Sequence, residues 1–292
     1  MKNLIVVTGG AGFIGSNLIN LLLVKTKYEI WSIDDYSTGK KTNHIKNKRV
    51  KYINNQTKNI SKILEEKKKN IKTLFHFGEF ARIYQSFLKI NECINSNSVG
   101  SHEVFNFCFV NKIKLIYSAT SASIGNNGND KNLSPYAFTK AKNLELLENF
   151  KKWFGLKFEI IYFYNVYGPN QISKGKMATV IGLFEDQYKN DKNLTVVRPG
   201  TQTRRFTHVD DTVNACYFAF KRNKNRHYSI SHKKSYSIIQ VAKMFGNKIK
   251  YLPKRPGERF ASALTDMSLS NKVHKLYGKI DLKKYIKAFK SK

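Results

Sequence analysis

Short apolar runs alternate with longer stretches of helical periodicity through the first half of the chain. The runs predict β-strands near residues 3–8, 29–34, 50–54, 72–77, 113–118 and 158–163. The stretches between them, at residues 13–24, 58–68, 92–111 and 136–154, have helical length and place apolar residues at helical spacing. Strands that alternate with helices in this way form a parallel sheet covered on both faces. We therefore expect an α/β protein with a doubly wound sheet.

The pattern changes after residue 169, where the predicted segments become shorter. They are a helix near 176–190, a strand near 194–198, a helix near 210–222 and then small elements. No internal repeat, low-complexity linker or coiled coil interrupts the chain. We expect residues 1–169 to form the sheet domain and residues 170–292 to form mainly a smaller C-terminal α/β lobe that packs against it.

Composition favours a soluble cytoplasmic protein with a substantial core. The chain has 292 residues, of which 41% are hydrophobic. The first apolar run, Leu4 to Thr8, is too short for a secretion signal, and no run reaches the roughly 18 residues of a membrane span. Cys93, Cys108 and Cys216 are widely spaced and form no C-x-x-C pair, so we expect buried thiols with neither a disulfide framework nor a metal site.

The net charge of +32 raises the possibility of nucleic-acid binding, because basic surfaces attract phosphate backbones. The lysines, however, are spread along the whole chain beside many Asn, Ile, Tyr and Phe residues, a mixture typical of an AT-rich genome. We therefore expect no specific nucleic-acid partner. Non-specific attraction of polyanions and faster capture of anionic substrates are the expected consequences.

A glycine-rich loop follows the first predicted strand. It reads Thr8-Gly9-Gly10-Ala11-Gly12-Phe13-Ile14-Gly15 and leads directly into the first helix. Gly9 permits a tight turn, Gly12 lets the backbone approach a pyrophosphate, and Gly15 allows close helix–strand packing. The helix N-terminus offers unpaired N–H groups and a positive dipole end. This arrangement predicts a Rossmann-type site for a dinucleotide.

The end of the second strand indicates which dinucleotide binds. Asp34 and Asp35 follow the glycine loop by about 20 residues, the spacing of the ribose-binding acid in such sites. Their carboxylates would accept hydrogen bonds from the adenosine ribose and repel a 2′-phosphate. We therefore expect NAD rather than NADP.

Tyr136 and Lys140 are four residues apart, a spacing that places both on one face of a helix. The same spacing also occurs at Tyr36/Lys40, Tyr188/Lys192 and Tyr217/Lys221. The pair at 136 differs because Ser134-Pro135 is a helix-start signal. The pair also follows a strand that delivers Ser118 and Thr120 to the ligand-binding carboxyl edge of the sheet.

These residues suit hydride chemistry at a carbinol carbon. Loss of hydride requires loss of the hydroxyl proton, which a tyrosinate can accept. Lys140 would lower the pKa of Tyr136 and hold the cofactor ribose, and Thr120 would orient the reacting oxygen. The predicted catalytic residues are Thr120, Tyr136 and Lys140.

The ordered motifs resemble the extended short-chain dehydrogenase/reductase superfamily, in particular NAD-dependent nucleotide-sugar epimerases of the UDP-glucose 4-epimerase kind. Beyond the glycine loop and the Tyr136/Lys140 pair, the matching segments are Asp34 to Gly39, His76-Phe77-Gly78, Asn97 with Gly100, Thr120, Tyr164 to Pro169, Thr203-Arg204 with Val209-Asp210-Asp211, and Arg255-Pro256-Gly257-Glu258.

The resemblance implies further site residues. It places Phe13, Ile14, Asn55, Asn97 and Ser118 in the NAD site, with Asn55 where relatives have an aspartate. It also places Asn165, Arg204 and Arg255 against the diphosphate of a nucleotide-sugar bound by the C-terminal lobe, in keeping with bidentate phosphate binding by arginine. Family members commonly form homodimers through a four-helix bundle, here built from helices 92–111 and 136–154. Phe105, Phe107 and Phe109 would supply its apolar surface or pack in the core.

The residues after Thr120 narrow the reaction. Relatives that dehydrate the sugar have an Asp-Glu pair there, decarboxylating relatives have a glutamate, and C3/C5 epimerases have a cysteine, whereas this chain has Ser121-Ala122. Reversible oxidation, most simply at C4, is the predicted chemistry. A nucleotide-sugar 4-dehydrogenase or reductase and a non-catalytic NAD- or nucleic-acid-binding relative remain alternatives.

Glu79 and Arg82 are unusual after His76-Phe77-Gly78. We expect them either to form a polar pocket that selects an uncommon sugar or to pair with each other.

Overall fold

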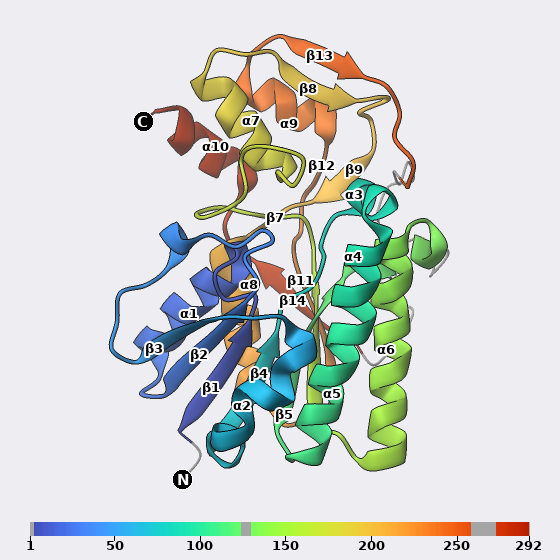
Figure 1. Ribbon diagram of the computed structural model, residues 1–292. Coiled ribbons are helices and arrows are strands. Elements are labelled where there is room, and N and C mark those ends of the chain that lie inside the picture. Colours follow the sequence, from blue (N-terminus) through green and yellow to red (C-terminus); the bar gives the residue numbers. More distant parts are fainter. Residues whose placement is uncertain (1–2, 124–129, 258–272, 292) are drawn as a thin grey trace.

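The computed structural model describes residues 3–123, 130–257 and 273–291, and its centre is one eight-stranded sheet (Figure 1). Every neighbouring pair in this sheet is parallel, and the strand order is β14-β11-β6-β5-β4-β1-β2-β3. The strands are β1 (Leu4–Thr8), β2 (Glu29–Asp34), β3 (Val50–Asn54), β4 (Ile71–His76), β5 (Lys114–Thr120), β6 (Phe158–Phe163), β11 (His227–His232) and β14 (Val273–Gly278). The predicted doubly wound sheet is confirmed.

Helices cover both faces of the sheet (Figure 1). One layer contains α1 (Phe13–Lys25) and α8 (Val209–Phe220). The other contains α2 (Ile60–Leu64), α4 (Ile90–Ile94), α5 (Ser101–Val110) and α6 (Pro135–Phe154), with a π-helical segment, Asn95–Gly100, between α4 and α5. Two details differ from the sequence prediction. The helix expected at 58–68 is a short α2 between 3₁₀ turns, and α3 (Ile83–Leu88) was not expected.

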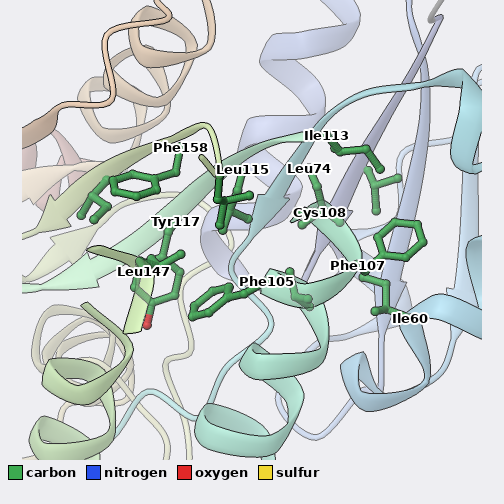
Figure 2. Close-up of a cluster of buried hydrophobic side chains, with 14 of the residues drawn as sticks. Ile60, Leu74, Phe105, Phe107, Cys108, Ile113, Leu115, Tyr117, Leu147 and Phe158 are labelled. Atoms are coloured by element: carbon green, nitrogen blue, oxygen red, sulfur yellow. The ribbon is translucent and has the colours of Figure 1, made fainter. Parts of the chain in front are cut away.

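The central strands are apolar on both faces because helices bury both. In β1, Leu4 and Val6 belong to the cluster beneath α5 and α6, whereas Ile5 and Val7 belong to the cluster beneath α1 and α8. Figure 2 shows the first cluster, in which Phe105 packs edge-on against Tyr117 and Phe107 lies beside Ile60. Continuous apolar strands are typical of a parallel sheet covered on both sides.

A smaller lobe lies beyond the carboxyl edge of the sheet (Figure 1). It has its own core, formed by α7 (Val180–Lys189), α9 (Ile238–Phe245), α10 (Leu282–Lys290), β8 (Leu194–Val197) and β13 (Ile249–Leu252). Two short pairs lie below it, β7 (Val166–Tyr167) with β10 (Thr207–His208) and β9 (Thr203–Arg205) with β12 (Ser235–Ser237).

The predicted boundary at residue 169/170 does not separate these two bodies. Strands β11 and β14 and helix α8 all come from the second half of the chain, yet they complete the main sheet and one of its helical layers. The chain therefore passes repeatedly between sheet and lobe. Short exposed runs such as β14 gave no periodic signal strong enough to assign them to the sheet.

The three cysteines are free thiols and all are buried, as expected from their spacing. Among the described residues, none of the helices combines the length and the apolar character needed to span a bilayer.

Candidate active site

The strand order reverses between β1 and β4, the position at which doubly wound sheets have their ligand-binding crevice. The order runs from β1 through β2 to β3 on one side and from β4 to β14 on the other, so the connections leave in opposite directions at this point. Ligands of doubly wound sheets bind at such a switch point, beyond the carboxyl ends of the strands. Here β1 delivers Thr8 and the glycine loop, and β4 delivers His76.

The glycine loop has the shape that the sequence predicts. Gly9 has φ of 72°, a left-handed conformation that side chains disfavour. A Cβ on Gly15 would overlap the carbonyl oxygen of Gly9. Gly12 is the N-cap of α1 and supplies no capping side chain. The loop therefore leaves the helix N-terminus clear for a phosphate, with Phe13 and Ile14 half-buried in the first helical turn.

Asp34, the last residue of β2, accepts hydrogen bonds that hold this loop in place. Its Oδ2 accepts a hydrogen bond from the backbone N–H of Ala11 at 2.9 Å, and its Oδ1 accepts one from Tyr36 at 2.9 Å. Burial raises the pKa of the Asp34 carboxyl, and these backbone donors oppose that rise. A carboxylate has about four acceptor sites, so one remains for a ribose hydroxyl beside the backbone N–H groups of Ala11, Gly12 and Tyr36. Asp35 is exposed, and its Oδ1 accepts from the N–H of Ser37.

These features fit a dinucleotide. Gly9 and Gly15 are packed too closely against neighbouring backbone to accept a Cβ, which gives the tight turn of a dinucleotide-binding loop, and an acidic residue lies at the end of the neighbouring strand. Asn55 follows β3, and its Oδ1 accepts from the side-chain amide of Asn59 at 2.8 Å. The residues present therefore suit NAD.

Two other predicted cofactor residues act within the protein interior. Asn97 is fully buried, and its amide bonds the backbone N–H and C=O of Phe80 at 2.6 and 3.0 Å. These bonds hold the segment after β4 in place, and the expected cofactor contact of Asn97 stays a prediction. Ser118 donates to the carbonyl of His76 at 3.0 Å, which joins the ends of β4 and β5.

The catalytic candidates converge at the carboxyl edge of the sheet. Thr120 is the last residue of β5, and its Oγ1 accepts from the N–H of Ala122 at 3.2 Å. Helix α6 begins at Pro135, with Ser134 accepting from Ala137 as its N-cap. This cap fixes the first turn, which contains Tyr136.

Helix α3 also holds that turn, because the Ser86 Oγ accepts from the N–H of Tyr136 at 3.2 Å. The side chain of Lys140, one turn later, donates to the carbonyl oxygen of Ser118. Helix α6 and the end of β5 are thereby tied together at the predicted catalytic residues.

Lys140 also forms a buried ion pair with Glu79. The ammonium bonds the Glu79 Oε2, and the two side chains are only 5% and 3% exposed. The other oxygen, Oε1, accepts from Ser101 at 2.9 Å, Tyr117 at 3.0 Å and Asn143 at 3.1 Å. Both carboxylate oxygens of Glu79 are therefore bonded within the protein, one of them to the predicted catalytic lysine.

Sequence reasoning missed this network because its members are far apart along the chain. Only Asn143 has a local signal in the sequence, because it follows Lys140 by three residues on α6 and so lies on the same helical face. Ser101 and Tyr117 carried no pattern that linked them to Glu79.

Arg82 does not pair with Glu79. Its Nε donates to the carbonyl of Met177 at 2.8 Å, and its Nη1 donates to that of Ala81 at 2.7 Å. It therefore joins the start of α3 to the segment before α7. Burial lowers the pKa of Arg82, and the negative charge of an ionised Tyr136 opposes that change. Arg82 thus lies close enough to Tyr136 for their charges to interact.

The three predicted diphosphate ligands lie at the junction of sheet and lobe. Asn165 has φ of 39° and donates to the carbonyl of Arg205 at 2.9 Å. Arg204 in β9 is buried, with its Nη1 on the carbonyl of Thr203. The guanidinium of Arg255 lies 5.3 Å from the ring centre of Tyr84 in α3. Glu258, which completes the matching motif, is outside the described residues.

A family model of the NAD dependent epimerase/dehydratase family matches residues 5–231. This match covers most of the sheet, the glycine loop and all three catalytic candidates. The chain therefore belongs to the NAD-dependent epimerase/dehydratase family, an enzyme family whose cofactor is NAD.

Individual relatives agree with this assignment. The chain is 27% identical to a putative UDP-glucose 4-epimerase of Methanocaldococcus jannaschii, over 96% of this chain and 90% of that protein. Its fold matches a UDP-glucose 4-epimerase of Thermotoga maritima solved with UDP-glucose, with a TM-score of 0.85, 24% identity and coverage of 97% and 96%. It also matches a UDP-glucuronic acid 4-epimerase of Bacillus cereus in complex with UDP-glucuronic acid and NAD, with a TM-score of 0.83, 26% identity and coverage of 99% and 98%.

Proposed function

We propose that this protein is a nucleotide-sugar epimerase that inverts C4 through a transient 4-keto sugar. The observation that carries the proposal is the hydrogen bond from Lys140 to the Ser118 carbonyl, which ties the helix of Tyr136 and Lys140 to the end of the strand that carries Thr120. Ser121 and Ala122 follow Thr120, where an added acid or base would stand. Glu79 is bound to Lys140 and buried, so it does not supply that acid. The named epimerase relatives support the same reaction class.

Each catalytic side chain has a separate task in this proposal. Tyr136 takes the proton of the C4 hydroxyl and later returns it. Thr120 hydrogen-bonds the same oxygen and orients it. Lys140 favours the tyrosinate by its charge and binds the cofactor ribose. NAD, when bound, supplies a hydride acceptor that becomes the donor in the return step.

The substrate would lie between the sheet and the smaller lobe. Asn165, Arg204 and Arg255 approach that junction from three different segments, and arginine binds phosphate oxygens in bidentate fashion. Arg82 reaches from α3 to the segment before α7 near Tyr136. We assign the diphosphate to the first three residues and a polar group of the sugar to Arg82.

The same proposal includes a homodimer, as in the family pattern. The outer surfaces of α5, α6 and the segment before α5 expose Val99, Val110, Phe138 and Trp153, each between 44% and 62% exposed. Figure 1 shows α4, α5 and α6 side by side at one flank of the molecule. Phe105 and Phe107 are instead buried in the core, so the core-packing alternative holds for them.

The proposal is tested by incubating the purified protein and NAD with a panel of UDP-, GDP-, ADP- and dTDP-sugars and resolving the products by chromatography. We expect a C4 epimer without accumulation of NADH, and no product from Tyr136→Phe. Accumulating NADH with a keto product would instead identify a dehydrogenase. No turnover of any sugar would contradict the catalytic assignment and favour a non-catalytic relative.

A further inference from the structure

The Glu79 carboxylate is enclosed by hydrogen-bond donors from three parts of the fold. Lys140 and Asn143 come from α6, Tyr117 from β5 and Ser101 from the start of α5. With only 3% of its side chain exposed, Glu79 is a buried anion whose oxygens are all bonded within the protein. Such a charge is stable only when it is paired and hydrogen-bonded. Its pairing partner here is the predicted catalytic lysine.

Three titratable groups around the pair, His76, Cys93 and Tyr117, are uncharged near neutral pH. Burial lowers the pKa of His76 to about 4, so this imidazole on β4 is neutral. Burial raises the pKa of Cys93 on α4 and of Tyr117 on β5, so both keep their protons. Tyr136 on α6 and Arg82 at the start of α3 complete the surrounding groups. Glu79 is thus the anion that compensates Lys140.

Lys140 depends on that anion to remain an ammonium. Burial alone lowers the pKa of Lys140, because a low dielectric disfavours the charged form, and Glu79 opposes this change through its charge and its hydrogen bond. An ammonium has three N–H donors. Glu79 and the Ser118 carbonyl use two of them, and the ammonium also lies 4.4 Å from the ring centre of Tyr117. These contacts fix where the third donor can point.

We propose that Glu79 is a positioning residue that keeps Lys140 protonated and in place beside Tyr136, and so sets the pH range in which the tyrosine–lysine pair works. The inference rests on the proposed roles of Tyr136 and Lys140. It assigns Glu79 a role at the site, which is to compensate the charge of Lys140.

Glu79 acts through its charge and not as a route for protons to solvent. Its hydrogen bonds continue from Ser101 to the His76 Nε2 at 2.9 Å and from the His76 Nδ1 to Thr8 at 2.7 Å. Ser101, His76 and Thr8 are all fully buried. The network therefore ends inside the protein, beneath the glycine loop. A reaction that returns its proton to the product has no need of an exit.

The test compares the wild type with Glu79→Gln, Glu79→Asp and Glu159→Gln. Glu159 is a matched control, because it is also fully buried and lies 3.8 Å from a lysine, Lys114, but contacts the backbone N–H groups of Lys224 and Arg226 far from the crevice. The first readout is the titration of the Lys140 ammonium in the protein without added cofactor, by ¹⁵N NMR of the lysine side chains. Lys140→Arg assigns the signal. The second readout is the pH profile of kcat.

In Glu79→Gln we expect the titration midpoint of the Lys140 ammonium to fall by at least about one pH unit. The decline of kcat at alkaline pH should shift to lower pH by a similar amount. Glu79→Asp keeps the charge and should restore much of both. Glu159→Gln should lower the melting temperature without moving either midpoint. An unchanged Lys140 midpoint in Glu79→Gln would overturn the proposal, as would an equal shift in Glu159→Gln. If the wild type turned over no sugar, the proposed function would fail, while the NMR titration would still decide the role of Glu79.

Discussion

Burial of the single residue His76 makes the stability of the fold depend on pH. Its two ring nitrogens bond Thr8 and Ser101, and the ring is inaccessible to solvent. Burial lowers the pKa of His76 from 6.5 to about 4. The folded protein therefore binds this proton less well than the unfolded chain does. The free energy of unfolding is therefore highest above pH 6.5. It decreases as the pH falls toward 4, because the unfolded chain binds the proton and the folded protein does not.

We predict that His76 alone makes the free energy of unfolding fall by roughly 2 to 3 kcal/mol between pH 7 and 4.5. Urea denaturation at both pH values, compared between the wild type and His76→Gln, isolates this contribution from that of the carboxylates. The variant should be less stable at pH 7 but lose less on acidification. Equal pH dependence in the two proteins would show that His76 is not held neutral.

Arg82 allows a second test at the scale of one residue. If it binds the sugar, Arg82→Met should raise KM for the nucleotide-sugar at least about tenfold, because a charge-assisted hydrogen bond contributes roughly 1.5 to 3 kcal/mol. The effect on kcat should be smaller. Steady-state kinetics of both proteins provide the measurement, and an unchanged KM would contradict the sugar contact.

At the scale of elements, the connection from β1 to α1 determines cofactor binding. Ala at position 15 would place a methyl group against the carbonyl oxygen of Gly9. We predict that Gly15→Ala weakens NAD binding at least about tenfold, measured by isothermal titration calorimetry, because the loop can no longer close on the helix. Gly155→Ala is the control. Gly155 has φ of 70° at the end of α6 with open space around it.

The control should lose about 1 kcal/mol of stability and bind NAD normally, since only the backbone conformation is disfavoured there. Equal losses of NAD affinity in both variants would show that general destabilisation, rather than the loop, is responsible.

The elements that sequence predicted well share a strong periodic signal. The first six strands and α1, α6 and α8 lie within a few residues of their expected ends, because each has a clear apolar run or face. The single helix expected at 92–111 is instead α4, a π-helical segment and α5 in succession. The Thr120, Tyr136 and Lys140 site could be predicted because local features, a strand end and a capped helix start, position it.

What sequence missed depends on contacts between distant segments. Glu79 meets Lys140 across 61 residues, and Asp34 meets Ala11 across 23. Neither pairing leaves a pattern in local spacing. Likewise, β14 pairs with β11 although its outward residues are mostly polar, so it has no clear strand alternation. Tertiary packing decides these features.

At the scale of the whole molecule, dimer formation is open to direct measurement. We predict that light scattering after size-exclusion chromatography gives twice the mass of the 33.7 kDa chain. Trp153→Glu should yield monomers, because it places a charge in the apolar surface of α6. Val24→Glu is the control, since Val24 is 74% exposed on α1 in the opposite layer. A monomeric wild type would contradict the proposed dimer.

In the proposed epimerase, oxidation and reduction occur at the same sugar carbon within one binding event. The most direct test of this proposal uses a nucleotide-sugar substrate carrying deuterium at C4, with the product examined by mass spectrometry and NMR. The expected result is an epimerised product that retains deuterium at C4, with no label in the solvent or in released cofactor. Loss of the deuterium to solvent, or its recovery in free NADH, would rule out the proposed epimerase mechanism.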